Sequence, residues 1–160
     1  GIVIDVAHLT DDDPLFWDII ETSEDPIIAS HHSTRGANDI PSALGDEGIK
    51  AIAEKGGVIG IHFASEWVNA GVGQATVGEL IRDIAHVVEL VGVEHVGLGP
   101  DFAELEWLGM KSSEYYIAGV DSLARMFRVT EALVESGYSD QEIKKILGEN
   151  FLRVYRQVIG

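Results

Sequence analysis

Four short apolar runs, each ending in a histidine or an aspartate, constrain the fold of this chain more than any other feature. The runs span residues 2–10, 26–32, 57–63 and 96–101, and they carry His8, His31, His62 and Asp101 at or near their ends. Short runs rich in valine and isoleucine are typical of buried strands. We therefore predict four strands whose carboxyl ends each present a side chain that can bind a metal or accept a proton.

Helical segments separate these strands. Asp13-Pro14 is a typical helix start, residues 46–55 have helical spacing, and the capping box Thr76–Glu79 begins a helix that continues to residue 92. Two further helices are expected at residues 121–135 and 139–158. Because strands alternate with helices and no hairpin signals occur, the sequence predicts an α/β protein with a parallel sheet covered by helices.

Four parallel strands form either a small open sheet or half of an eight-stranded barrel. The three longest loops, residues 33–45, 64–74 and 102–119, follow the second, third and fourth strands, where (β/α)8 barrels build their active sites. An open doubly wound sheet usually has a glycine-rich loop after its first strand, and residues 6–11 contain no glycine. We therefore predict half of a (β/α)8 TIM-type barrel.

His8 and His31 form the first candidate site. Neighbouring parallel strands lie about 4.8 Å apart, so imidazoles at two strand ends can converge on one metal ion. Zinc accepts neutral imidazole and makes its bound water a nucleophile near neutral pH. The alternative is two buried histidines that only hydrogen-bond the backbone.

Asp101 and His62 end the fourth and third strands. The small residues at 97, 99 and 100 leave room beside Asp101, which would either bind a metal or take a proton from an attacking water. A turn cap is the alternative for this carboxylate. His62 would contact a substrate or hydrogen-bond a neighbouring loop. His32 is expected to point to the other face of its strand, where it is either structural or supports a ligand without binding the metal itself.

Charge and composition exclude several kinds of site. The chain has 27 acidic and 11 basic residues, a net charge of −16, which disfavours nucleic-acid and membrane-surface binding. It has no cysteine, so disulfides and thiolate metal sites are excluded. No signal segment or membrane span is evident, and we predict a cytoplasmic protein. The start at Gly1 indicates a processed chain or a fragment.

Several phrases of the sequence resemble the membrane (renal) dipeptidase family. They lie at residues 4–10, 26–31, 46–53, 56–61, 88–102 and 146–154, and they cover nearly the whole chain in the family's order. The resemblance implies a (β/α)8 metal-dependent hydrolase related to amidohydrolases. It also implies that residues 1–160 are a single unit, the C-terminal half of that barrel, with the N-terminal half absent.

The resemblance also implies roles for individual residues. His8 and His31 match ligands of one of two zinc ions, and Asp101 matches the residue that accepts and donates the proton at the bridging water. The remaining ligands belong to the first half of the barrel, so we predict that the isolated chain is inactive. We expect it to pair with that half, or with itself, through its exposed strand edges.

Three departures from the family pattern concern the substrate. Ser42 and Ala43 align with an Arg-Asn pair whose arginine grips the substrate carboxylate, and Arg35 in the same loop is the candidate replacement. His62 stands where relatives commonly have asparagine. The family's Asp-Phe-Asp-Gly reads Asp-Phe-Ala-Glu at residues 101–104.

The leading hypothesis is a zinc hydrolase of dipeptides or small amides. The alternative is a non-catalytic or altered-specificity relative that acts as a binding or assembly subunit. Metal chemistry is better supported by the sequence than dipeptide specificity.

Overall fold

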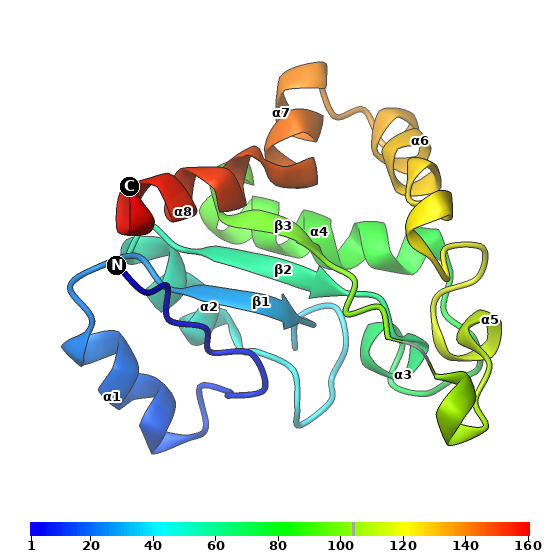
Figure 1. Cartoon of the computed structure of the whole chain (residues 1–160), viewed down its shortest axis with the longest axis horizontal. Coiled ribbons are helices and arrows are strands. Elements are labelled where there is room, and N and C mark those ends of the chain that lie inside the picture. Colours follow the sequence, from blue (N-terminus) through cyan, green and yellow to red (C-terminus); the bar gives the residue numbers. More distant parts are fainter. Residues whose placement is uncertain (104) are drawn as a thin grey trace.

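A three-stranded parallel sheet forms the centre of the molecule (Figure 1). The computed structural model describes residues 1–103 and 105–160, and for residue 106 it describes the backbone alone. Its elements in chain order are α1 (Pro14–Thr22), β1 (Ile28–His32), α2 (Asp46–Glu54), β2 (Val58–His62), α3 (Ser65–Val68), α4 (Val77–Val91), η1 (Val93–His95), β3 (Val96–Gly99), η2 (Glu106–Leu108), α5 (Ser112–Tyr115), η3 (Leu123–Arg125), α6 (Phe127–Glu135), α7 (Asp140–Lys144), η4 (Lys145–Glu149) and α8 (Asn150–Ile159).

The strands follow one another across the sheet in the order β1-β2-β3. Ile59 and Ile61 of β2 belong to the large apolar core together with Ile49 of α2 and Leu80 of α4, so both helices cover the same face. In a barrel, consecutive strands are neighbours and their connecting helices all lie on one face. In a doubly wound sheet the strand order reverses, and connecting helices lie on both faces. The predicted α/β class is confirmed.

The predicted strand at residues 2–10 is wrong as a regular strand. Among the described residues it forms a single parallel bridge, Asp5 to Ile28, flanked by backbone hydrogen bonds from Val6 N to Ile28 O and from Ile28 N to Ile4 O. The carboxylate of Asp5 accepts the N–H groups of Ala7 and Ser30, at 3.0 and 2.9 Å. These bonds replace ladder pairing, and the segment turns away after residue 6.

The second face of the sheet is packed by helix α8. Val154 and Val158 contact Ile28 and Val58 at the amino ends of β1 and β2. A Cβ atom at Gly97 would lie 2.5 Å from the Phe151 ring, so only glycine leaves room for that ring on β3. Because α8 covers the amino ends, the carboxyl ends of the strands are left for a site.

Two polar residues of α8 fix this position. The Asn150 side chain donates to the carbonyls of Val93 and Val96, both at 2.7 Å. Arg153 donates to the carbonyls of Gly56 and Glu94, at 2.7 and 2.9 Å. These carbonyls lie at or next to the amino ends of β2 and β3, and the two side chains connect α8 to that edge of the sheet.

The C-terminal helices differ from the prediction in their continuity. The capping boxes at Thr76 and Ser139 are present as expected. The predicted helix from residue 139 to 158 is interrupted by the π-helical turn η4, in which Gly148 has a non-helical φ of 169°. The predicted helix at 121–135 is a 3₁₀ turn, η3, followed by α6. After the break at η4 the chain returns along the sheet as α8 (Figure 1).

A fully buried carboxylate, Asp83 on α4, connects that helix to the loop after β1. It accepts hydrogen bonds from the Thr34 N–H and hydroxyl and from the Asn38 amide. Burial raises the pKa of Asp83 to about 7, although these donors and the nearby His86 favour its charged form. The loop that carries Arg35 and Ser42 is therefore anchored to the core at Asp83.

None of the helices within residues 1–103 and 105–160 combines the length and the apolar character that crossing a membrane requires.

Candidate active site

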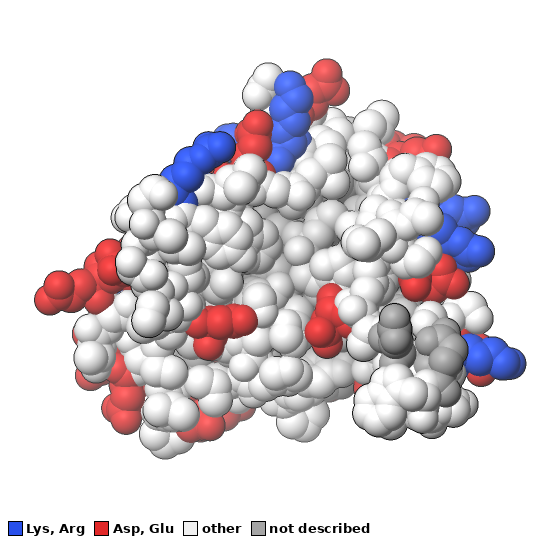
Figure 2. Space-filling model, in the orientation of Figure 1, with Lys and Arg blue, Asp and Glu red and all other residues white. Residues whose placement is uncertain are grey.

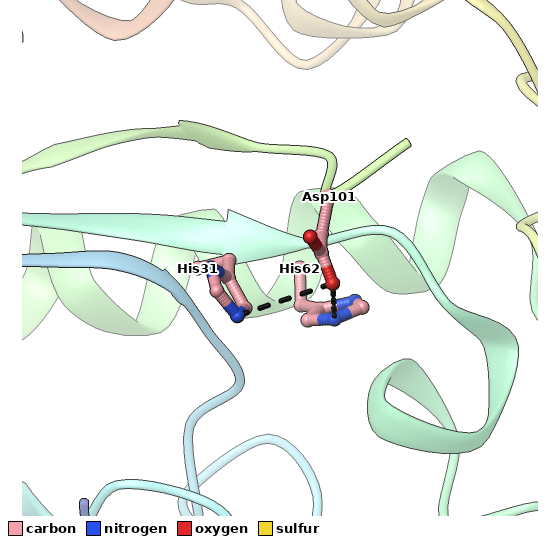
Figure 3. A group of neighbouring side chains, drawn as sticks. All are labelled: His31, His62 and Asp101. Atoms are coloured by element: carbon pink, nitrogen blue, oxygen red, sulfur yellow. Dashed lines mark ion pairs between the residues drawn. The ribbon is translucent and has the colours of Figure 1, made fainter. Parts of the chain in front are cut away.

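Four predicted site residues converge at the carboxyl end of the sheet. His31 lies on β1, His62 ends β2, Asp101 follows β3, and His8 joins them from the N-terminal segment. The ring centroid of His31 lies 4.7 Å from that of His8 and 5.4 Å from that of His62. Figure 3 shows His31, His62 and Asp101 projecting from neighbouring strands toward one point.

The geometry of His8 and His31 fits a shared metal ion. Their Nε2 atoms face each other at 2.9 Å. Two imidazole nitrogens bound to one tetrahedral zinc ion lie about 3.3 Å apart, so only a few tenths of an ångström separate this pair from ligand spacing. The Nδ1 atom of His31 contacts the Ser30 hydroxyl at 3.0 Å, the outer contact that orients a metal-binding imidazole.

Asp101 is held by its backbone and leaves its carboxylate accessible. Its φ of 50° is unusual for a residue other than glycine, and Tyr116 donates its hydroxyl to the Asp101 carbonyl at 2.8 Å. The same hydroxyl accepts the Ala103 N–H at 2.8 Å. The side chain remains 51% exposed, with Oδ2 at 3.4 Å from His62 Nε2 and 3.9 Å from His31 Nε2.

Hydrogen bonds determine which nitrogen of His62 carries the proton. Its Nδ1 accepts the backbone N–H of Ala64 at 2.8 Å, so Nδ1 cannot itself be protonated. In the neutral ring the proton is then on Nε2, which faces Asp101. Burial lowers the pKa of His62 to about 4, against the opposing effect of Asp101, so the ring is neutral near pH 7.

This tautomer decides whether His62 binds a metal or donates a hydrogen bond to Asp101. His31, His62 and Asp101 offer ligand atoms within 4.8 Å of one another, a spacing suitable for a cation. A protonated Nε2 cannot bind a metal, however, and the Ala64 N–H prevents the exchange of tautomers. His62 is therefore placed to donate to Asp101, which leaves His8 and His31 as the candidate pair of metal ligands.

We predict that long-range ¹H–¹⁵N correlation spectra of the chain show His62 as the Nε2–H tautomer between pH 6 and 8. His95, whose Nδ1 faces the Gly57 carbonyl at 2.9 Å, provides an internal control because it must donate from Nδ1. Observation of an Nδ1–H tautomer at His62 would contradict the assignment and return His62 to the metal ligands.

Two other predicted residues lie beside this cluster. His32 is buried and contacts the carbonyls of Leu9 and Ser33 at 2.9 and 3.3 Å. Burial lowers the pKa of His32. Because the Leu9 carbonyl follows His8 directly, His32 helps to position the segment that carries His8.

Arg35 is already engaged by acidic side chains. Its guanidinium donates to Asp12 at 2.6 Å and to the Ala43 carbonyl at 3.2 Å, and it lies 3.7 Å from Asp11. Asp11 also accepts the N–H of Gly45 at the start of α2. Arg35 therefore joins the first two loops. Ser42 is exposed and lines a cavity at the site.

Trp67 on α3 packs its indole against two histidines of the site. Its indole stacks on His62 with ring centroids 5.4 Å apart and planes 11° apart, and it meets His8 edge-on at 6.0 Å. Trp67 and Trp107 both lie in segments that follow strands. Trp107 is 79% exposed.

Residues 103 and 104 depart from the family pattern. The structure describes Ala103, whereas Glu104 lies outside the described residues.

Comparison with known proteins identifies the family. The sequence model of the membrane dipeptidases, Peptidase family M19, matches residues 1–159. The chain belongs to this family. A curated relative, dipeptidase ataJ of Aspergillus terreus, is 31% identical over 159 residues, which are 99% of this chain and 36% of that protein.

Solved structures of membrane dipeptidase relatives have the same fold. The probable dipeptidase PvdM from Pseudomonas aeruginosa matches with a TM-score of 0.87 at 22% identity, over 99% of this chain and 50% of PvdM. An amidohydrolase from the same organism matches with a TM-score of 0.84 at 26% identity, over 99% of this chain and 53% of that protein. The chain thus spans about one third to one half of its relatives' length and has the fold of about half of a dipeptidase barrel.

Proposed function

We propose that this chain supplies the second half of a metal-dependent hydrolase that cleaves dipeptide or small amide bonds. The convergence of His8, His31 and Asp101 at one open strand end carries this proposal. Membership of the dipeptidase family supports the same reaction class. Residues 1–160 would form one unit whose missing partner is the first half of the barrel.

His8 and His31 are the residues that would hold a metal ion, and zinc suits two neutral imidazoles best. A zinc ion there would polarise the scissile carbonyl and lower the pKa of a bound water to about 7. We further propose a second zinc ion, held by ligands from the first half of the barrel. Two histidines without that half bind metal weakly, so the isolated chain is expected to be inactive.

Asp101 is proposed to accept the proton of the attacking water and to pass it to the leaving amine. Its exposed carboxylate is 3.9 Å from a nitrogen of the metal-binding pair, close enough to reach a group bound there. His62 would hold the acceptor by donating Nε2–H to Oδ2. Trp67 shields the other side of His62 and restricts the movement of its ring.

The first half of the barrel is the proposed partner. In the described residues the outer edge of β3 pairs with no strand, and an unpaired edge favours association. Apolar side chains are exposed beside it, at Leu147, Leu152 and Tyr155 of η4 and α8. The middle of the face in Figure 2 is mostly white but includes acidic side chains, and lysine and arginine lie at its rim. Self-association through the same edge is the alternative arrangement.

A binding or assembly subunit is the second candidate function. It is favoured by the acidic contacts that occupy Arg35 and by the uncharged Ser42, because neither residue is then ready to grip a substrate carboxylate. The preserved geometry of His8, His31 and Asp101 favours the hydrolase.

Metal analysis joined to a peptidase assay tests the proposed function. The chain completed with its first half is expected to bind two zinc ions and to hydrolyse members of a dipeptide and amide panel. His8→Ala or His31→Ala should weaken the affinity for one ion by more than about 100-fold, since even an outer contact is worth about 10–100-fold.

His86→Ala is the matched control, because His86 pairs with Asp46 between α4 and α2. It should leave the metal content unchanged. Two bound ions without hydrolysis of any substrate would contradict the peptidase and support the binding subunit. Unchanged zinc affinity in both ligand variants would contradict the metal site.

A further inference from the structure

A cavity of about 420 Å³ lies between the loop after β1 and helix α3, and neither the proposed metal binding nor the proposed proton transfer takes place in it. The residues that line it come from two segments and are Ile40, Ser42, Glu66, Trp67, Ala70 and Gly71. Its size suits a short side chain or a small terminal group of a substrate.

Trp67 places this cavity next to the reacting centre. The indole contacts the rings of both His62 and His8 and also forms a wall of the cavity. His62 covers one face of the indole, so the cavity receives the opposite face or the edge. A substrate whose scissile bond lies near His8 can thus extend a substituent past Trp67 into the cavity.

The charge of the lining selects what can enter. Glu66 is the only ionisable side chain among the lining residues, and in the described part of the chain no lysine or arginine pairs with it. The Tyr115 hydroxyl contacts Glu66 only at 3.4 Å. Arg35, which lies in the same loop as Ser42, is held by Asp11 and Asp12. A carboxylate beside an indole attracts a cation and repels an anion.

We propose that this cavity binds a cationic group, an ammonium or a guanidinium, through Glu66 and Trp67, and that it rejects a carboxylate. Assigning that group to the substrate rests on the proposed hydrolase function, whereas the preference for a cation rests on the lining alone. The chain would then act on amides whose substituent beyond the scissile bond carries an amine, in contrast to a dipeptide that ends in a free carboxylate.

The test uses three probes of equal carbon length, butylammonium, butanol and butyrate, titrated into the full metal-free chain. The resonance of the Trp67 indole N–H reports occupancy of the cavity. Butylammonium is expected to bind about fivefold more tightly than butanol, the combined effect of one exposed ion pair and one cation–π contact, and butyrate should bind most weakly. Glu66→Gln should remove the preference for butylammonium.

Glu21→Gln is the matched control, because it makes the same change of net charge on α1, at the opposite end of the molecule from α3 (Figure 1). It separates a local effect from general attraction to a chain of net charge −16. Equal effects of the two variants, or butyrate binding as tightly as butylammonium, would overturn the proposal. Since no metal or hydrolysis is involved, this outcome is independent of the result for the hydrolase.

Discussion

Asp101→Asn in the completed barrel is expected to lower kcat by about 10²–10⁴-fold, the range for removal of a general acid–base group, without loss of bound metal. Asparagine has the size of aspartate, and its oxygen can still accept the Nε2–H of His62, so the local structure should survive. It cannot take a proton from water at neutral pH. The measurement is steady-state kinetics together with zinc content.

Zinc content decides between the two roles that the sequence leaves open for Asp101. Loss of one ion together with activity would make Asp101 a ligand and contradict its role in proton transfer. Asp12→Asn is the control, since that carboxylate is also exposed but only pairs with Arg35. It should leave kcat within about twofold, as for a weak surface ion pair.

Comparing the kcat of His62→Gln with that of His62→Ala tests whether His62 orients the Asp101 carboxylate. Glutamine can place an N–H donor near the position of Nε2, whereas alanine leaves the carboxylate without that partner. Partial rescue by glutamine would support the orienting role. Equal loss in both variants would indicate that the ring matters through its stacking on Trp67.

The strand ends were predictable from sequence because their signal is local. Each apolar run shows its own length and composition, and the rule that parallel strands align their carboxyl ends brings His31, His62 and Asp101 together. His8 reaches the site although its run forms only one bridge at Asp5. A single fixed residue three positions earlier is enough to direct the histidine, so the sequence predicts that His8 lies beside His31 even though its run is not a regular strand.

Long-range polar contacts were not predictable from the same information. Asp83 lies within an ordinary helical pattern, and its partners Thr34 and Asn38 are 49 and 45 residues away. Arg35 and Asp12 are separated by 23 residues, and neither residue type identifies the other. Such pairs depend on where loops meet in space, which periodicity does not encode.

Asp83→Ala is expected to destabilise the fold by about 3–5 kcal/mol, because it leaves two donors of Thr34 and one of Asn38 without an acceptor in the core. Chemical denaturation at pH 5 measures this loss. Asp46→Ala provides a control, because Asp46 is an exposed carboxylate that pairs with His86 between α2 and α4, and its loss should cost less than about 1 kcal/mol.

The pH dependence of stability gives an independent test of the burial of Asp83. Its pKa is raised from 3.8 to about 7, so the folded state binds the proton more tightly, and this contribution is fully present below about pH 4 and lost as the pH rises through 7. At about 1.4 kcal/mol per unit, the stability of the natural chain relative to Asp83→Asn should fall by about 4 kcal/mol over that window. The comparison cancels the other acidic groups, except for any shift at His86, which faces Asp83. A difference that stays constant from pH 4 to 8 would show that Asp83 remains ionised in the fold, held by its three donors against the cost of burial.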